Sequence, residues 1–429
     1  MANVLLFIDI NALHIGTVRD HVESLKSHSG HSFYIADCRG AIEATVALDR
    51  FDVVAFHYSV IISRHDFISR QLADACSAFR GLKVLFIQDE YRWIDQTVRA
   101  IAALGINVLF SVVNRDLLNV IYSDPSINGV RKELTLTGYV PEELTNLDVP
   151  TFSARPIDVG YRGRKVPFWL GAFAQEKWQI GERFKVDAVA LGLKIDIASD
   201  ERSRLYRRGW IDFLTKSKAV LGTESGASIC DFTGDIQRRV DQFVADNPGA
   251  TFEEVRVHCL EGIDGRHIIH VISPRCFEAA ALRTLMILYP GDYSGILEPW
   301  RHYVPLAKDH SNIEEVISVL RSPEQAQQII DAAYREIACN SRYTFATFVK
   351  HFDAVVDEEL NRPVFSEMSS RPLTFEKQLL ERILRRQIIK RWLYMKFVVA
   401  PASLRFYLPT WLRLVLRSLA VRMKLLPQS

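Results

Sequence analysis

Short apolar runs alternate with helical stretches twice along this chain, and that alternation most narrows the folds it can adopt. Strands that alternate with helices pair in parallel and are covered by helices on both faces. The first round of alternation occupies residues 1–150 and predicts one Rossmann-like domain. Its predicted strands are residues 4–10, 33–36, 53–57, 83–87, 106–113 and 133–140, and its predicted helices are residues 18–26, 42–48, 67–79 and 91–104.

The alternation restarts after a segment punctuated by Pro141, Pro150 and Pro156, which predicts an interdomain linker. A second Rossmann-like domain is therefore expected over residues 151–362, with a ligand-binding cleft between the two domains. Its predicted strands are residues 157–161, 194–197, 219–222 and 285–289. Its predicted helices are residues 173–191, 210–216, 235–247, 252–259, 312–320, 323–337 and 343–360, of which the last is expected to close the second domain.

Residues 272–306 are the strongest candidate for a ligand site. Ser273 and Pro274 predict a helix start, because serine caps free N–H groups and proline at the first helical position misses no hydrogen bond. The strand at 285–289 is followed by the loop Gly291-Asp292-Tyr293-Ser294-Gly295, and Ile296-Leu297-Glu298 is expected to open the next element. Backbone N–H groups at such a junction bind anions, and the junction stands at a strand end where α/β sheets bind ligands.

This stretch also carries a family resemblance. The segment Arg275-x-Phe277-Glu278-Ala279-Ala280, the strand after it, the Gly-x-x-Ser-Gly loop and Glu298 together resemble the donor-binding segment of group 1 glycosyltransferases, which include enzymes of bacterial surface-polysaccharide synthesis. The resemblance implies the GT-B fold, in which two Rossmann-like domains face a cleft and the final helices cross back to the first domain. It also implies that Glu278 binds the ribose of a nucleotide-sugar donor. Many members have a second glutamate that contacts the sugar, and this chain has His270 there. The donor contacts predicted in this stretch are Ser273, Arg275, Glu278, Tyr293, Ser294, Gly295, Ile296 and Leu297.

Basic residues are candidates for neutralising the negative charge of the leaving diphosphate. Glycosyl transfer requires a neutralised leaving diphosphate and an acceptor hydroxyl that is deprotonated or aligned. Arg162 and Arg164 follow the first strand of the second domain, where the resembled family often keeps a basic diphosphate contact; a solvated basic turn is the alternative. Arg275 stands at a helix start, where a cation is unfavourable unless an anion is near. It is therefore predicted to bind the donor and assist catalysis, with a surface salt bridge as the alternative.

Polar residues at three other strand ends complete the predicted site. Glu224 and Ser225 belong to a Ser/Gly-rich segment, which is expected to form a wall for the nucleotide or else a plain turn. In the first domain, His14 follows the first strand, and Asp89 and Glu90 follow the fourth. Both positions face the cleft in this fold class. These three side chains are predicted to touch the acceptor or serve as the catalytic base, or else to be caps and surface groups.

Metal and cofactor requirements follow from what the motifs lack. The sequence has no Asp-x-Asp metal motif after a strand, and GT-B enzymes typically work without a bound metal. We therefore expect metal-independent transfer of the hexosyltransferase type, in which positive side chains and backbone dipoles stabilise the leaving group. No cofactor is expected besides the nucleotide-sugar substrate.

Charge is distributed unevenly along the chain. Residues 371–429 hold thirteen Lys and Arg against two Asp and Glu, whereas the rest holds 40 basic and 49 acidic residues. Residues 375–399 and 410–426 place apolar and basic side chains on separate stripes at helical spacing, as in helices that lie in a membrane interface. Residues 363–429 are therefore predicted to attach the protein to an anionic membrane surface, or else to pack on the body or a second subunit. Large apolar residues interrupt the basic ones, so no nucleic-acid partner is expected.

Cysteine usage and the first residues bear on localisation. The chain has six cysteines without a C-x-x-C pair, which indicates a reducing compartment, and its first residues predict a β-strand rather than a signal peptide. The prediction is a cytoplasmic glycosyltransferase on the inner face of a membrane, acting on a glycan or lipid-linked acceptor. The alternative is a GT-B-like nucleotide-sugar epimerase, which would not need the basic tail, or a non-catalytic membrane-associated scaffold, which would not need Arg275 and Glu278 in one pocket.

Overall fold

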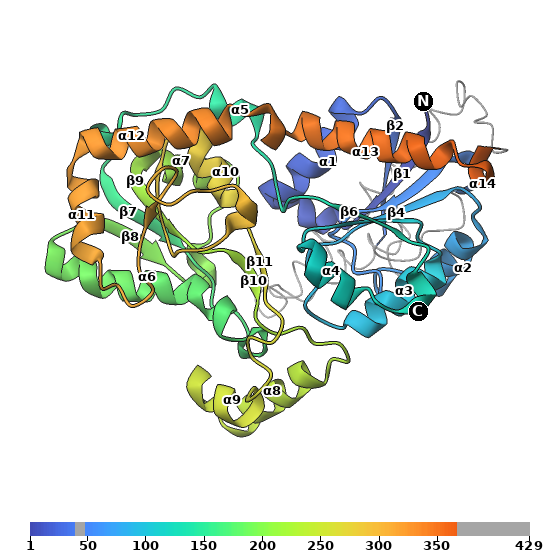
Figure 1. Cartoon of the computed structure of the whole chain (residues 1–429), viewed down its shortest axis with the longest axis horizontal. Helices are drawn as coiled ribbons and strands as arrows, with labels where there is room; N and C mark the ends of the chain where they lie inside the picture. Colours follow the sequence, from blue (N-terminus) through green and yellow to red (C-terminus); the bar gives the residue numbers. More distant parts are fainter. Residues whose placement is uncertain (39–47, 367–429) are drawn as a thin grey trace, which may run out of the picture.

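The computed structural model describes residues 1–38 and 48–366 and contains two α/β domains placed side by side (Figure 1). Each domain has its own parallel sheet, and residues from both domains line one cavity. The predicted fold class, two Rossmann-like domains that face a cleft in the GT-B arrangement, is confirmed. The amphipathic helices predicted within residues 375–426 lie outside the described residues. None of the helices in these described ranges has both the length and the apolar character that a membrane span requires.

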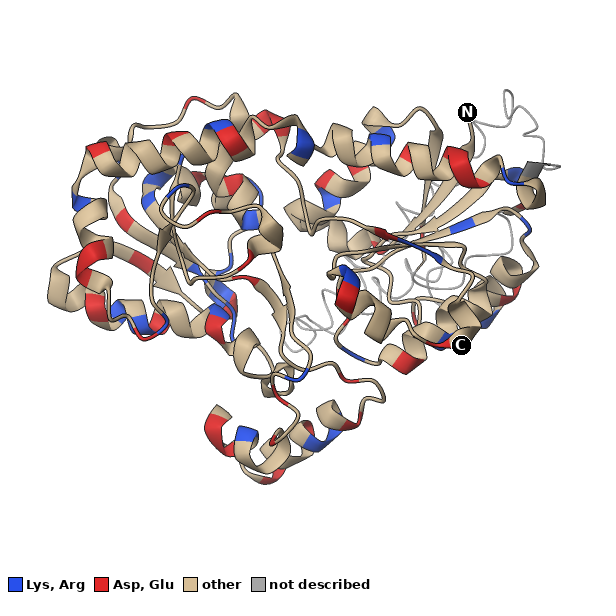
Figure 2. Cartoon of the chain, viewed as in Figure 1, with Lys and Arg blue, Asp and Glu red and all other residues tan. Residues whose placement is uncertain are grey.

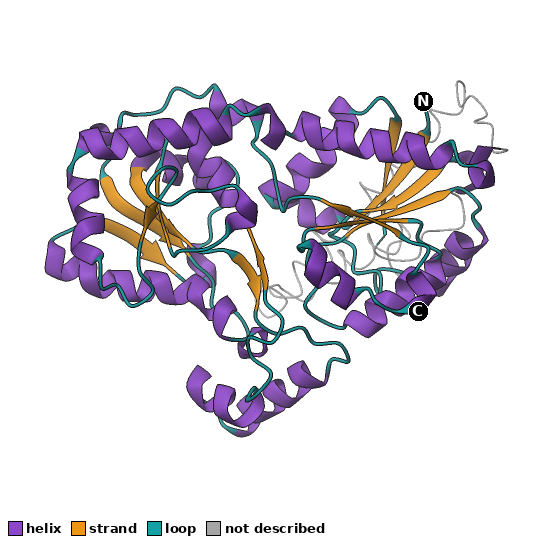
Figure 3. Ribbon diagram, in the orientation of Figure 1, coloured by secondary structure: helices purple, strands orange, loops and turns teal. Residues whose placement is uncertain are grey.

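The first sheet has six parallel strands in the order β2-β1-β3-β4-β5-β6. Figure 3 shows the sheet in orange with purple helices around it. Its central strands are buried over their whole length, because helices cover both faces and most positions are apolar. The strands are β1 (Asn3–Ile8), β2 (Ser32–Asp37), β3 (Val53–Phe56), β4 (Leu82–Phe86), β5 (Val108–Ser111) and β6 (Arg131–Leu134).

Helices α1 and α13 cover one face of this sheet, and helices α2, α3 and α4 cover the other (Figure 1). Of the helix predicted at 42–48, only Leu48 is among the described residues, and it begins the short 3-10 turn Leu48–Arg50. The bounds of the helices are α1 (Gly16–His28), α2 (Arg70–Ala78), α3 (Ile94–Leu104), α4 (Arg115–Ile121) and α13 (Phe345–Leu360).

The last strand of the first sheet is shorter than the sequence predicted. It ends at Leu134 rather than near residue 140, because the chain there turns toward the second domain. The Thr137 hydroxyl donates a 2.5 Å hydrogen bond to the Ile272 carbonyl. A side chain on Gly138 would place its Cβ 2.9 Å from the Cβ of Pro274. The linker, which contains the short helix α5 (Glu142–Thr145), therefore starts in contact with the candidate ligand segment.

The second sheet has five parallel strands in the order β13-β12-β9-β7-β8. Helices α6, α11 and α12 pack on one face, and α7 and α10 pack on the other. The strands are β7 (Ile157–Arg162), β8 (Ile195–Ala198), β9 (Ser217–Gly222), β12 (Leu285–Leu288) and β13 (Val304–Pro305). The helices are α6 (Ala172–Leu191), α7 (Arg208–Lys216), α10 (Pro274–Ala281), α11 (Ile313–Arg321) and α12 (Pro323–Ala333).

Two features of the second domain differ from the predictions. The Ser/Gly-rich segment around Glu224 and Ser225, for which no strand was predicted, contains β10 (Ser225–Ala227), which pairs antiparallel with β11 (Ile269–Val271). Between these strands, α8 (Asp235–Asp246) and α9 (Phe252–Cys259) form a projecting pair, which shares a small core with Trp169, Leu170 and Ala174 (Figure 1). After β12 the chain forms only the 3-10 turn Tyr293–Gly295, so no helix opens at the position where Ile296-Leu297-Glu298 was expected to start one.

Helix α13 packs on the first domain, as the resemblance implied. The prediction that it closes the second domain, within a unit of residues 151–362, is wrong on this point. The helix carries a row of apolar side chains that complements the first sheet. Phe352 is fully buried, with ring centroids 5.7 Å from Phe86 and 5.8 Å from Phe110.

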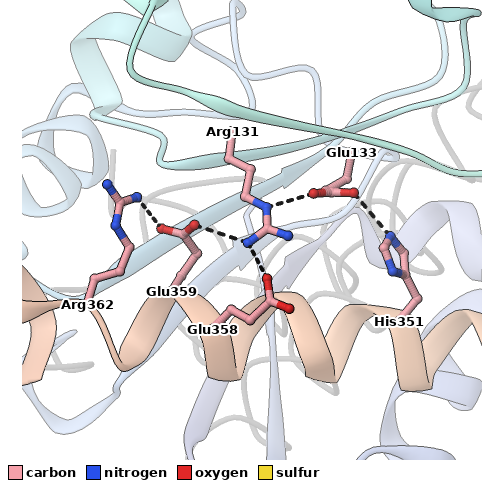
Figure 4. Close-up of polar contacts among 6 residues, drawn as sticks. All are labelled: Arg131, Glu133, His351, Glu358, Glu359 and Arg362. Carbon is pink, nitrogen blue, oxygen red and sulfur yellow. Dashed lines mark hydrogen bonds and ion pairs between the residues drawn. The ribbon is translucent and has the colours of Figure 1, made fainter.

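Polar contacts at the far end of α13 fix the same docking (Figure 4). Arg131 on the edge strand β6 donates to Glu133 at 2.7 Å and to Glu358 at 2.8 Å, and its Nη1 lies 3.3 Å from Glu359. Glu359 is buried and also accepts from Arg362 at 2.7 Å. Because Glu359 has two cationic partners, its burial is compensated, and the two domains are connected at this edge by a helix as well as by the linker.

Candidate functional site

One cavity of about 430 Å³ lies between the two domains. Its floor is formed at the carboxyl ends of β7, β9 and β12. The starts of α10 and α7 form one wall, and the start of α1 with residues 141–144 of the linker forms the other. Open α/β sheets bind their ligands at this position, so the cavity is the candidate active site.

Helix α10 begins in this cavity. Ser273 is its N-cap residue but makes no side-chain capping bond, and Pro274 occupies the first helical position. Arg275 follows and donates from Nη1 to the Arg162 carbonyl at 2.6 Å, with its guanidinium 5.2 Å from the centroid of the Trp210 ring. An uncapped helix start and a guanidinium therefore share one wall, and both favour an anion there.

Glu278 lies one turn further along α10 and lines the same cavity. The Trp210 indole N–H donates a 2.8 Å hydrogen bond to its carboxyl group. Burial raises the pKa of Glu278 to about 7, the Trp210 hydrogen bond and Arg275 lower it, and the charge of Asp20 raises it. A carboxyl group held at this helix and oriented by an indole can accept hydrogen bonds from ligand hydroxyls.

Lys177 is a cavity residue that the sequence did not single out. It lies in the second turn of α6. Burial and then Arg275 lower its pKa to about 8, and Asp89 opposes that shift. Lys177 is half-buried. Two cations this close together are electrostatically unfavourable without an anion. Figure 2 shows Lys and Arg segments on the side of the second domain that faces the first.

The two arginines after β7, Arg162 and Arg164, differ in whether the guanidinium already has partners within the protein. Arg162 lines the cavity, but its guanidinium is bonded to Asp196 at 2.9 Å and to the Ser203 carbonyl at 3.0 Å, and it lies over the Phe213 ring at 4.3 Å. It therefore supports the wall and offers its carbonyl to Arg275. Arg164 is exposed and also lines the cavity, so it is the arginine of this pair that is available to a ligand.

The first-domain residues that were predicted to reach the acceptor lie in three different environments. His14 is exposed just outside the cavity lining, with Nδ1 2.6 Å from the Asn11 carbonyl oxygen and its ring 5.2 Å from that of Tyr206 across the cleft. Asp89 accepts a 2.9 Å hydrogen bond from the Tyr91 hydroxyl. It does not line this cavity.

Glu90 is not at the cavity, which corrects its prediction as an acceptor-side group. It is buried inside the first domain, where it accepts hydrogen bonds from the Ser111 hydroxyl at 2.6 Å and the Tyr122 hydroxyl at 2.8 Å. Burial raises its pKa to about 7, against the effect of those hydrogen bonds. The strand-end rule failed here because the chain turns after β4 and directs this side chain into the core.

The glycine loop and Glu224 lie beside the cavity rather than in its lining. Tyr293 is fully buried and donates its N–H to Glu224 at 2.7 Å, and the Ser294 hydroxyl accepts from the Ile272 N–H at 3.1 Å. Glu224 also lies 3.4 Å from His270, and this contact raises the pKa of the imidazole. The predicted donor contacts of Glu224, Tyr293, Ser294, Gly295, Ile296 and Leu297 are therefore not brought to this cavity, whereas Ser225 and Ser273 do line it.

Asp20 is a further cavity residue that the sequence analysis missed. It lies in the second turn of α1, on the wall opposite α10, and its side chain is 16% exposed. A single aspartate inside an amphipathic helix looks like a solvated surface group, and no local pattern distinguishes it. Only the packing of the two domains brings it to face Glu278.

Comparison with known proteins gives structural likeness only. No family model and no curated protein matches the chain. HepE from Anabaena in complex with UDP has a TM-score of 0.48 and 10% identity over 83% of this chain and 100% of its own. The BGT of phage T4 in complex with its UDP-glucose substrate has a TM-score of 0.48 and 13% identity over 83% and 100%. TarM has a TM-score of 0.40 and 10% identity over 71% and 54%. Likenesses this weak carry no argument about function, which rests on the residues of this chain.

Proposed function

We propose that this protein is a glycosyltransferase that moves a sugar from a nucleotide-sugar donor to a glycan or lipid-linked acceptor. One observation carries the proposal: the uncapped start of α10, Arg275, Lys177 and Glu278 surround one interdomain cavity. The helix start, Arg275 and Lys177 are suited to bind a diphosphate, and the carboxyl group of Glu278 is suited to accept hydrogen bonds from ribose hydroxyls. The acceptor would bind on the other side of the cavity, along the wall formed by α1 and the linker.

The proposed chemistry assigns separate tasks to the two cations. Arg275, fixed over Trp210, would hold the diphosphate in place with directed hydrogen bonds. Lys177, which lacks a paired carboxylate among the described residues, would neutralise the negative charge that develops as the sugar–phosphate bond breaks. Because these side chains supply the positive charge, we also propose that transfer needs no bound metal ion.

The direct test is turnover of a panel of UDP-, dTDP-, GDP- and ADP-sugars with water as the acceptor, with and without EDTA. We expect one nucleotide to release its sugar faster than a no-protein control, at a rate that EDTA leaves unchanged. Failure of every donor both to turn over and to bind would contradict the transferase assignment. Activity that disappears with EDTA and returns with manganese would contradict metal independence alone.

We further propose that residues 363–429 hold the enzyme at the cytoplasmic face of a membrane that contains anionic lipids. Their basic and apolar stripes support this, since each Lys or Arg near such a surface contributes about 1 kcal/mol. The expected result is that the full chain floats with anionic liposomes and a chain ending at Arg362 does not. If both chains remain in the soluble fraction, packing on the body or on a second subunit becomes the better account of the tail.

The alternatives from the sequence are an epimerase and a scaffold. An epimerase would interconvert free nucleotide sugars without releasing the nucleotide, so product analysis in the same panel distinguishes it. A scaffold would turn over none of the donors. The charge of Lys177 at the cavity, with no ion pair to a described carboxylate, favours an enzyme, because a scaffold has no need to place a cation there.

A further inference from the structure

On the first-domain part of the wall opposite the donor-side cations, one acidic group lines the cavity. Asp20 is on α1, whose first residues Gly16 and Thr17 line the cavity with it. It lies 3.0 Å from Arg19, its neighbour on the helix. Arg275 and Glu278 are on the other wall, so the cavity presents cations and a ribose-type carboxyl group from one domain and an aspartate from the other.

The charged surroundings of Asp20 come from several elements. Arg19 and Glu23 lie on its own helix, Glu143 comes from α5 and Glu278 from α10. On the first-domain side the Tyr58 hydroxyl, whose pKa is raised by burial and further by Asp20, donates to the Thr17 carbonyl at 3.2 Å. Burial raises the pKa of Asp20 to about 6, and Arg19 only partly offsets that effect. The group is thus ionised at neutral pH yet more basic than a free aspartate, as a general base requires.

The other acidic and imidazole candidates of the first domain are less well placed. His14 stands outside the cavity lining with Nδ1 against the Asn11 carbonyl. Glu90 is buried among Ser111 and Tyr122. Asp89 binds the Tyr91 hydroxyl and does not line the cavity. Among the described residues, Asp20 and Glu143 are the carboxylates that the first-domain wall and the linker bring to the cavity, and Glu143 belongs to the linker helix rather than to the domain facing α10.

We propose that Asp20 is the catalytic base that takes the proton from the acceptor hydroxyl during transfer. This inference rests on the proposed function and adds the identity of the base. In the step, the acceptor O–H gives its proton to the Asp20 carboxylate, and the acceptor oxygen forms a bond to the anomeric carbon. The bond between that carbon and the donor phosphate oxygen breaks, and its electron pair leaves with the nucleoside diphosphate on the side of Lys177 and Arg275.

The test compares Asp20→Asn with Glu23→Gln, a neutralised carboxylate on the same helix that is 68% exposed and outside the cavity lining. Both proteins are assayed at saturating concentration of the donor that the wild-type protein hydrolyses fastest, with water as acceptor. Positioned proton transfer contributes about 100- to 10,000-fold, so Asp20→Asn should lose at least about 100-fold in turnover while Glu23→Gln stays within about twofold. Wild-type turnover should fall as the pH drops through about 6, where Asp20 becomes protonated. This fall should be absent in Asp20→Asn and retained in Glu23→Gln.

Binding of the nucleoside diphosphate to each variant serves as the check on folding and on the donor site. Asp20→Asn is expected to bind it at least as well as wild type, because one negative charge near Glu278 is gone. Wild-type turnover and an unchanged acid limb in Asp20→Asn would overturn the assignment of Asp20 and leave the transferase proposal intact. Equal losses in both variants would also overturn it, since a general effect of charge on α1 would then explain them. Absence of donor binding and turnover in the wild-type protein would overturn both.

Discussion

Lys177→Met should lower donor turnover by about 100- to 1,000-fold, the cost of removing one preorganised group that stabilises developing negative charge, or ~2.7–4 kcal/mol. Methionine fills a similar volume, so the packing of α6 is preserved. The half-buried ammonium group has no ion pair with a described carboxylate, so its removal should not destabilise the fold. Single-turnover rates with the hydrolysed nucleotide sugar measure the effect.

The control for this substitution is Lys185→Met, on the same helix two turns later. Lys185 pairs with Glu182 at 2.9 Å and stands outside the cavity lining, so its loss should leave turnover unchanged. A Lys177→Met protein that turns over donor as fast as Lys185→Met would remove the leaving-group role from Lys177.

Glu278→Ala should weaken nucleoside diphosphate binding at least about tenfold, because a hydrogen bond to a charged group contributes roughly 1.5–3 kcal/mol. Calorimetric titration measures this directly. Glu298→Ala is the matched control, since Glu298 is an exposed carboxylate of the same domain outside the cavity. Equal dissociation constants for Glu278→Ala and wild type would exclude Glu278 from the ligand site.

The two groups also predict the pH dependence of donor binding. The pKa of Glu278 is about 7, so its carboxylate is present above that pH and affinity should fall as pH drops below it. The pKa of Lys177 is about 8, so its ammonium is present below that pH and affinity should fall as pH rises above it. Affinity is therefore greatest between these values. Arginine stays charged throughout, so Lys177→Arg should flatten the alkaline limb and leave the acid limb unchanged.

Most of the fold followed from local sequence patterns. Buried parallel strands such as β3 and β4 are short apolar runs, and Pro323 after Ser322 marks the start of α12, where the serine side chain accepts from the Gln325 N–H at 3.4 Å. The misses arise where tertiary contacts decide the local structure. Strand β6 stops early because the chain turns to contact Pro274, and α13 leaves the second domain because Phe352 and its neighbours complement the first sheet.

The candidate site was only partly visible in the sequence, for a different reason. Arg275 and Glu278 belong to one helix start, and a contiguous pattern marks them. Lys177 and Asp20 each lie in the second turn of a helix, α6 and α1, in different domains. No local pattern marks them, and only the assembled cavity brings them together. The glycine loop is the opposite case, because its sequence pattern suggested anion binding but its polar groups already have partners within the protein. The Tyr293 N–H donates to Glu224, and the Ser294 hydroxyl accepts from the Ile272 N–H.

The most direct test of the central claim is a crystal structure of the protein with the nucleoside diphosphate of its preferred donor. The expected result is a diphosphate at the start of α10, with oxygens within hydrogen-bond distance of Arg275 and Lys177, and ribose hydroxyls on Glu278. A diphosphate bound outside this cavity, or one that contacts neither cation, would contradict the account.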